Sequence, residues 1–133
     1  MVYNLCKSKV IYIFAPKIKN RVKISFGTKK LEEYASDEKK RIKKLGPLRA
    51  GLYKQRLDDL YAASTLEETR YLPGHYHELK GDRKGQWACD LDQPYRLIFT
   101  PTARPIPTDP DGKYIWIEID SIEIEEIDNY HGK

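Results

Sequence analysis

The segment "PGHYHELKGDRKGQWACDLDQPYRLIFTP" gathers proton carriers and cations beside two short apolar runs. His77 and Lys80 stand just before a charged turn, and Arg83 and Lys84 lie within it. Histidine and lysine side chains can move protons, and arginine and lysine can bind a phosphate group. A hydrophobic core does not need such residues, so the segment indicates a site for an anionic substrate.

Arg96 lies inside the apolar run "YRLIF", which has the alternation of a β-strand. In a strand, Tyr95 and Leu97 point to one face of the sheet, and Arg96 and Ile98 point to the other. Burying an unpaired guanidinium is costly. We therefore expect Arg96 to reach an open cleft, a carboxylate partner or an anionic ligand.

Tyr130 and His131 follow the last strand pattern, where a chain end can fold back across a sheet. Together these side chains suit the cleavage of RNA by attack of its own 2′-hydroxyl on the neighbouring phosphate, a group that DNA lacks. The reaction needs a base, an acid for the departing 5′-oxygen and cations, but no cofactor and no metal. His75 is interpreted as a structural or solvated histidine, and no metal-ligand spacing is present.

The charge of the chain is unevenly distributed. Residues 1–56 carry sixteen Lys or Arg against four Asp or Glu, a net charge of +12, whereas the remainder carries eight against sixteen, or −8. A basic first half favours a polyanionic partner, most often a nucleic acid. A solvated helix face is the alternative explanation.

The length of 133 residues fits one domain with a modest core. The apolar run "VIYIFAP" near the N-terminus is too short to span a bilayer and lacks a small-residue cleavage site, so we expect no membrane segment and no signal peptide. Cys6 and Cys89 form no disulfide framework, which favours the cytoplasm. Residues 1–20 are interpreted as an N-terminal extension, and residues 21–133 as the main domain.

Strand and helix patterns predict an α+β fold with helices packed on one face of a sheet. Strands are expected at "RVKISF", "HYHEL", "QWACDL" and "PYRLIF", and the longest at "YIWIEIDSIEIEEI". One helix should begin after Thr28 and run through Tyr34, and another should run over residues 47–63. The second helix has an apolar face made of Leu48, Leu52, Tyr53, Leu57, Leu60 and Tyr61. Residues 100–113 carry four prolines and are expected to form an exposed loop.

The block "LPGHYHELKGDRKGQWACDLDQPYRLIF", followed by the terminal "IDNYH", resembles the HigB-type branch of the RelE/ParE toxin superfamily. The resemblance runs from about Arg21 to His131. It implies a microbial RNase fold, with two N-terminal helices packed on one face of a mostly antiparallel sheet. It also implies a ribosome-dependent endoribonuclease that cleaves translated messenger RNA, and a cognate antitoxin, expected to be a helix-turn-helix protein of the HigA type.

The resemblance implies roles for particular residues. By analogy, His77 or Lys80 would handle the 2′-hydroxyl proton, and Arg96 would hold the scissile phosphate. Tyr130 or His131 would orient the base or complete proton transfer. Contacts to RNA are expected from cations of the turn and of the basic segment "EKKRIKK", namely Arg83, Lys84, Lys43 and Lys44.

The sequence departs from the family pattern at Asn129, where an aspartate is usual and where Asp128, one position earlier, could substitute. Residues 1–20 and the proline-rich loop are also extra. Two other functions stay open: an inhibitor of DNA gyrase in the manner of the ParE branch, which does not cut RNA, and an inactive relative that only binds an antitoxin.

Overall fold

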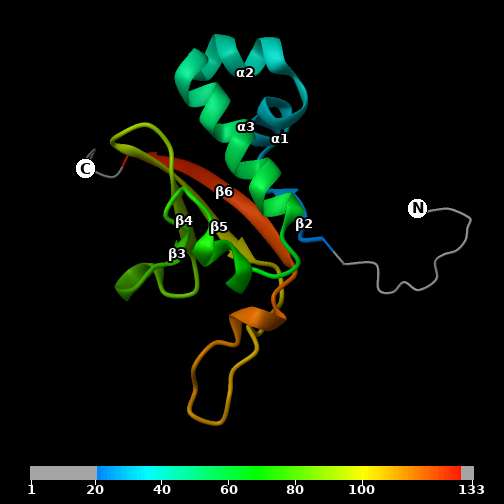
Figure 1. The fold of residues 1–133 in the computed structure, drawn as a ribbon, viewed down its shortest axis with the longest axis vertical. Helices are drawn as coiled ribbons and strands as arrows, with labels where there is room; N and C mark the ends of the chain where they lie inside the picture. Colours follow the sequence, from blue (N-terminus) through cyan, green and yellow to red (C-terminus); the bar gives the residue numbers. More distant parts are fainter. Residues whose placement is uncertain (1–20, 130–133) are drawn as a thin grey trace, which may run out of the picture.

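The computed structural model describes residues 21–129, so the predicted N-terminal extension lies outside the described residues. Within that range the chain forms three α-helices and one five-stranded sheet, and the predicted α+β class is confirmed (Figure 1). The helices are α1 (Lys29–Ser36), α2 (Glu38–Leu45) and α3 (Pro47–Ala62). The strands are β2 (Lys23–Phe26), β3 (His77–Glu78), β4 (Trp87–Asp90), β5 (Tyr95–Pro101) and β6 (Ser121–Asn129).

The strand order in the sheet is β2-β6-β5-β4-β3. The last described strand, β6, therefore lies between the first, β2, and β5. β2 pairs with β6 in parallel, and every other neighbouring pair of these strands is antiparallel. The three helices lie in the connection between β2 and the rest of the sheet, because a parallel pair needs a long crossover rather than a tight turn.

The helices begin where their caps predict. The Thr28 hydroxyl accepts a hydrogen bond from the backbone N–H of Leu31, and Pro47 occupies the first turn of α3. The sequence interpretation missed α2, which covers the basic segment and is capped by Asp37 through the backbone N–H of Lys40. The expected count of two N-terminal helices was therefore wrong. α2 packs on α1 and α3.

The main core lies between the helices and one face of the sheet. Helix α3 buries Ala50, Tyr53, Leu57 and Leu60 against the strands. The predicted apolar face was wrong at its two ends, because Leu48 is 66% exposed and Tyr61 is 52% exposed. These two residues lie in the first and last turns of the helix, and the Arg21 guanidinium covers the Tyr61 ring at 5.4 Å. From the strands the core takes Trp87, Cys89, Leu97, Phe99, Ile122 and Ile124.

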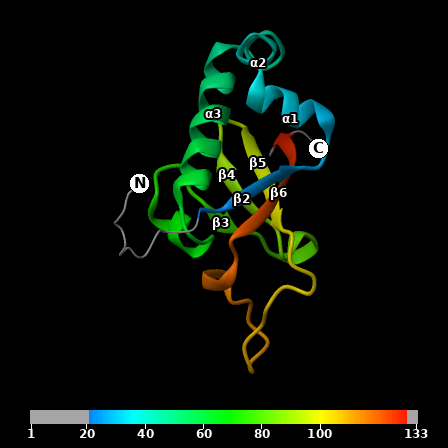
Figure 2. The same ribbon diagram turned by 90° about the vertical axis from the view of Figure 1, so that its right-hand side faces the viewer.

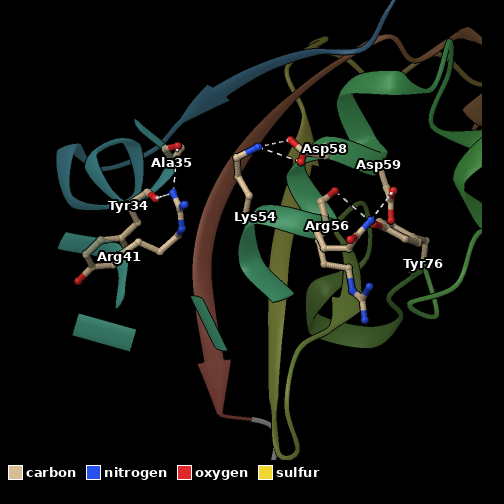
Figure 3. A network of polar contacts seen from close by, with 9 residues as sticks. Tyr34, Ala35, Arg41, Lys54, Arg56, Asp58, Asp59 and Tyr76 are labelled. Atoms are coloured by element: carbon tan, nitrogen blue, oxygen red, sulfur yellow. Dashed lines mark hydrogen bonds and ion pairs between the residues drawn. The ribbon is translucent and has the colours of Figure 1, made fainter. Parts of the chain in front are cut away.

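Buried polar contacts tie the helices to one another and to the start of the sheet. Arg41 of α2 is buried and donates hydrogen bonds to the carbonyl oxygens of Tyr34 (2.7 Å) and Ala35 (3.3 Å) near the end of α1 (Figure 3). The Tyr76 hydroxyl donates to the carbonyl of Arg56 on α3 at 3.2 Å. Burial raises the pKa of the Tyr76 phenol above its usual value. These contacts hold α3 against the segment that leads into β3.

The predicted longest strand was wrong in its first half. Residues Trp116–Glu118 form a short 3₁₀ helix instead, and β6 begins only at Ser121. Packing favours the turn, because the Trp116 ring meets Trp87 edge-on at 5.4 Å and its Nε1 donates to the Glu78 carboxylate at 2.8 Å. The proline-rich loop before it is mostly exposed, as predicted, and Figures 1 and 2 place it at the opposite end of the molecule from α2.

Candidate active site

A pocket of about 180 Å³ opens beside the β4–β5 turn. It brings together two of the predicted catalytic residues, His77 from β3 and Arg96 from β5. One of its walls comes from the turn that joins β4 to β5. The full lining is His75, His77, Asp90, Gln93, Pro94, Tyr95 and Arg96.

Strand pairing explains why His77 and Arg96 share a face of the sheet. His77 pairs with Ala88, and Arg96 pairs with Asp90, two residues further along the same strand. Residues two apart in a strand point to the same face, so these side chains form neighbouring rows. Ile98 packs with Ala88 in a small cluster separate from the main core. The predicted division of β5 into two faces is confirmed by these contacts.

Arg96 has a carboxylate partner, one of the three alternatives that the sequence left open. Its Nε donates to Oδ2 of Asp128 at 3.0 Å, and the two side chains are 16% and 18% exposed. Arg96 nevertheless lines the pocket, so the ion pair does not seal it inside the protein. Asp128 thus supplies a carboxylate next to Arg96, one position before Asn129.

The hydrogen bond of His77 determines which ring nitrogen carries the proton. Its Nδ1 lies 2.7 Å from the carbonyl oxygen of His75. A carbonyl only accepts, so Nδ1 carries the hydrogen and donates it. In the neutral ring, Nε2 then holds the lone pair and can take a proton. The backbone therefore leaves Nε2 as the proton-accepting nitrogen of the neutral His77 ring.

His75, which the sequence analysis interpreted as structural or solvated, also lines the pocket. Its side chain is 66% exposed, yet its ring stacks on His77 with centroids 4.0 Å apart and planes 15° from parallel. Its Nδ1 lies 3.6 Å from Oδ2 of Asp90. Strand alternation could not have placed it, because His75 has a φ of 58° and lies in a turn before β3 rather than in the strand.

Helix α3 fixes the backbone behind the two histidines. The Nε of Arg56 donates to the carbonyl of Asp90 at 2.7 Å, and the N–H of Asp90 donates to the carbonyl of Gly74 at 2.8 Å. Gly74 has a φ of 118°, and a Cβ at this position would lie 2.9 Å from Nε of Arg56. Only glycine fits here, and the close approach connects α3 to the His75 backbone. Figure 3 shows Arg56 and Tyr76 side by side at this junction.

A second arginine of α3 holds the β4–β5 turn. Arg49 donates from Nε and Nη2 to the two carboxylate oxygens of Asp92 at 2.9 and 3.1 Å. Its guanidinium also stacks over the ring of Tyr95, a pocket residue, 3.6 Å from the centroid. The hydrogen bonds from Arg49 lower the pKa of the Asp92 carboxyl below its usual value. This contact sets the position of one wall of the pocket.

We expect the Arg49–Asp92 pair to make the protein less stable in acid. Because the pKa of Asp92 is lowered on folding, the unfolded chain takes up its proton at a higher pH than the folded chain. The contribution is complete above the ordinary carboxyl pKa of about 3.9 and is lost as the pH falls through the lower folded value. At pH 7, Arg49→Met should reduce the free energy of unfolding by about 1–2 kcal/mol. Below about pH 5, the free energy of unfolding of this variant should also decline less steeply than that of the wild type.

Urea denaturation between neutral and acidic pH measures this difference. The matched control is Lys54→Met, because Lys54 pairs with Asp58 at 2.7 Å but both side chains are largely exposed. At each pH, the free energy of unfolding of the control should agree with that of the wild type within about 0.5 kcal/mol. Identical acid curves for Arg49→Met and the wild type would show that the pair contributes nothing.

The other predicted site residues do not line this pocket. Lys80 is exposed just before the turn Gly81–Arg83. Arg83 makes an ion pair with Glu126 at 3.2 Å, and Lys84 lies 5.6 Å from the centroid of the Tyr114 ring. Lys43 and Lys44 lie in the last turn of α2. Tyr130 and His131 lie outside the described residues, but the last described residue, Asn129, pairs with Tyr95 at the pocket.

A second hollow, of about 280 Å³, lies on the basic helices. It is lined by four lysines with one glutamate and one tyrosine: Lys29, Lys30, Lys40, Lys44, Glu33 and Tyr34. One of the lysines is paired, since Nζ of Lys40 lies 3.1 Å from a carboxylate oxygen of Glu33. The hollow is suited to an anionic surface. Its Lys44 is one of the two α2 lysines that were predicted to contact RNA.

Among residues 21–129, no group of three or more His, Cys, Asp or Glu side chains is arranged to hold a metal ion. None of the helices in this range has both the length and the apolar character needed to cross a bilayer. A comparison of the chain with protein-family models found no match, and a comparison with curated proteins found no significant match.

Proposed function

We propose that this protein is a metal-independent endoribonuclease that cuts messenger RNA on the ribosome, a toxin of the HigB type. The observation that carries the proposal is that His77 and Arg96, distant in the sequence, line the same open pocket. A nuclease needs a proton carrier and a fixed cation at one phosphodiester. A protein that only binds a partner has no need to place these two groups together.

The proposed reaction uses the 2′-hydroxyl of the substrate as nucleophile. Nε2 of His77 takes the hydroxyl proton, and the oxygen attacks the adjacent phosphorus. Arg96, held by Asp128, binds the phosphate oxygens where negative charge increases. The bond from phosphorus to the 5′-oxygen breaks, this oxygen takes a proton from a general acid, and the products are a 2′,3′-cyclic phosphate and a 5′-hydroxyl. The proton transfer is worth about 10²–10⁴-fold in rate, and the preorganised charge about 10²–10³-fold.

The basic helices support docking on ribosomal RNA. Lysines of α1 and α2 line the second hollow, and Lys43 and Lys44 complete the last turn of α2. Contacts of this kind neutralise phosphates and release counterions, so the association should weaken steeply as salt rises. The role of the ribosome and of a helix-turn-helix antitoxin is proposed from the resemblance of the segment between positions 72 and 99 to HigB-type toxins.

Purified full-length protein and programmed ribosomes test the proposal. Cleavage should occur within the translated message, produce a 5′-hydroxyl end, and stop when a single 2′-deoxynucleotide replaces the ribonucleotide at the mapped site. Induced expression should arrest growth, and a co-expressed antitoxin should relieve the arrest. Intact messages combined with inhibited DNA supercoiling would instead indicate a gyrase inhibitor. Intact messages with normal growth would indicate an inactive relative.

A further inference from the structure

We propose that His75 is a catalytic residue, the general acid that gives a proton to the departing 5′-oxygen, while His77 is the base. This inference rests on the proposed nuclease function and adds a residue to it. The observation behind it is the stacked pair of imidazoles in the pocket, with ring centroids 4.0 Å apart. A reaction that moves one proton onto a base and another onto a leaving group needs two such carriers.

The surroundings of the two rings differ, and the difference assigns their roles. Nδ1 of His77 faces a carbonyl, which leaves its Nε2 as an acceptor in the neutral ring. Nδ1 of His75 faces the carboxylate of Asp90 at 3.6 Å. A carboxylate stabilises a positive charge beside it, whereas a carbonyl only orients the ring that donates to it, so we assign the acid to His75 and the base to His77. Two neighbouring groups in unequal environments are the usual arrangement of an acid–base pair.

The backbone of His75 gives an independent argument for function. Its φ of 58° makes it the one non-glycine residue between positions 21 and 129 in the left-handed region. Glycine adopts this conformation readily, whereas a residue with a Cβ is uncommon there. An exposed position of positive φ that has no function does not require a histidine side chain. Strained backbone of this kind clusters at functional sites.

The proposed step moves one proton onto His77 and another proton off His75. The 2′-hydroxyl proton passes to Nε2 of His77, and a bond forms between the 2′-oxygen and phosphorus. The bond between phosphorus and the 5′-oxygen breaks, its electron pair stays on that oxygen, and the Nε2 proton of His75 neutralises it. His77 ends protonated and His75 ends neutral, and exchange with water restores both. The attacking and leaving oxygens lie at opposite ends of an in-line displacement, and two stacked rings provide two nitrogens for them.

A substrate with sulfur in place of the 5′-bridging oxygen tests the assignment, because a thiolate leaves without a proton. The informative variant is His75→Asn, since asparagine tolerates the positive φ but cannot transfer a proton. On ordinary message in programmed ribosomes, His75→Asn should cleave about 10²–10⁴-fold more slowly than the wild type. On message carrying the sulfur at the mapped site, the variant should regain a rate close to that of the wild type. His77→Asn, which lacks the base, should stay slow on both substrates.

The outcomes separate the two proposals. If the wild type cuts neither message, the nuclease function fails and the role of His75 fails with it. If the wild type cuts both and His75→Asn keeps the wild-type rate on ordinary message, only the inference about His75 is overturned. A variant that is slow on both substrates would show a positioning role rather than an acid. Thermal denaturation should show that His75→Asn is about as stable as the wild type, because asparagine tolerates the positive φ of this position.

Discussion

Asparagine in place of His77 should slow cleavage of ribosome-bound message by about 10²–10⁴-fold with little loss of stability. The side-chain amide can still donate to the carbonyl of His75, where Nδ1 of the imidazole now donates at 2.7 Å. The local backbone is therefore retained, while the proton acceptor at Nε2 is lost. Single-turnover cleavage at saturating protein measures the chemical step apart from binding.

A control for the His77 experiment lies elsewhere on the surface. Gln55→Ala removes an exposed side chain of α3 that donates a hydrogen bond to Asp59 of the same helix. It should cleave at the wild-type rate. Unfolding free energies of both variants should agree with that of the wild type within about 1 kcal/mol. A His77→Asn protein that cleaves as fast as this control would remove His77 from the mechanism.

Arg96→Gln should produce the second large effect, a fall of about 10²–10³-fold in cleavage rate, because a preorganised charge at the phosphate is lost. It should also destabilise the fold, because the Asp128 carboxylate, only 18% exposed, loses the Nε donor that is now 3.0 Å away. Activity and stability therefore fall together in this variant, and a second substitution is needed to separate them.

The double variant Arg96→Gln with Asp128→Asn separates catalysis from stability. Removing both charges leaves two amides that can bond to each other, so the free energy of unfolding should recover by about 1–3 kcal/mol relative to Arg96→Gln alone. The cleavage rate should stay low, because no cation faces the phosphate. Chemical denaturation and single-turnover kinetics on the same samples give both readouts. Recovery of cleavage together with stability would show that Arg96 only supports the fold.

Local chemistry was enough to predict several features of this protein. The caps at Thr28 and Pro47 act within one helical turn, so the starts of α1 and α3 could be predicted from neighbouring residues. Alternation along "YRLIF" likewise places Arg96 and Ile98 on one face whatever the strand pairs with. The requirement that a guanidinium in such a strand must find a partner also follows from its charge alone.

Only the tertiary structure decided which residues meet. The partner of Arg96 is Asp128, 32 positions away, and the two come together because β5 and β6 pair in one particular register. His75 enters the pocket because Gly74 and Arg56 of α3 fix a backbone turn that no short sequence pattern specifies. The first half of the expected last strand became a turn when Trp116 packed on Trp87. Periodicity reports the faces of single elements, whereas a site depends on contacts between elements far apart in the chain.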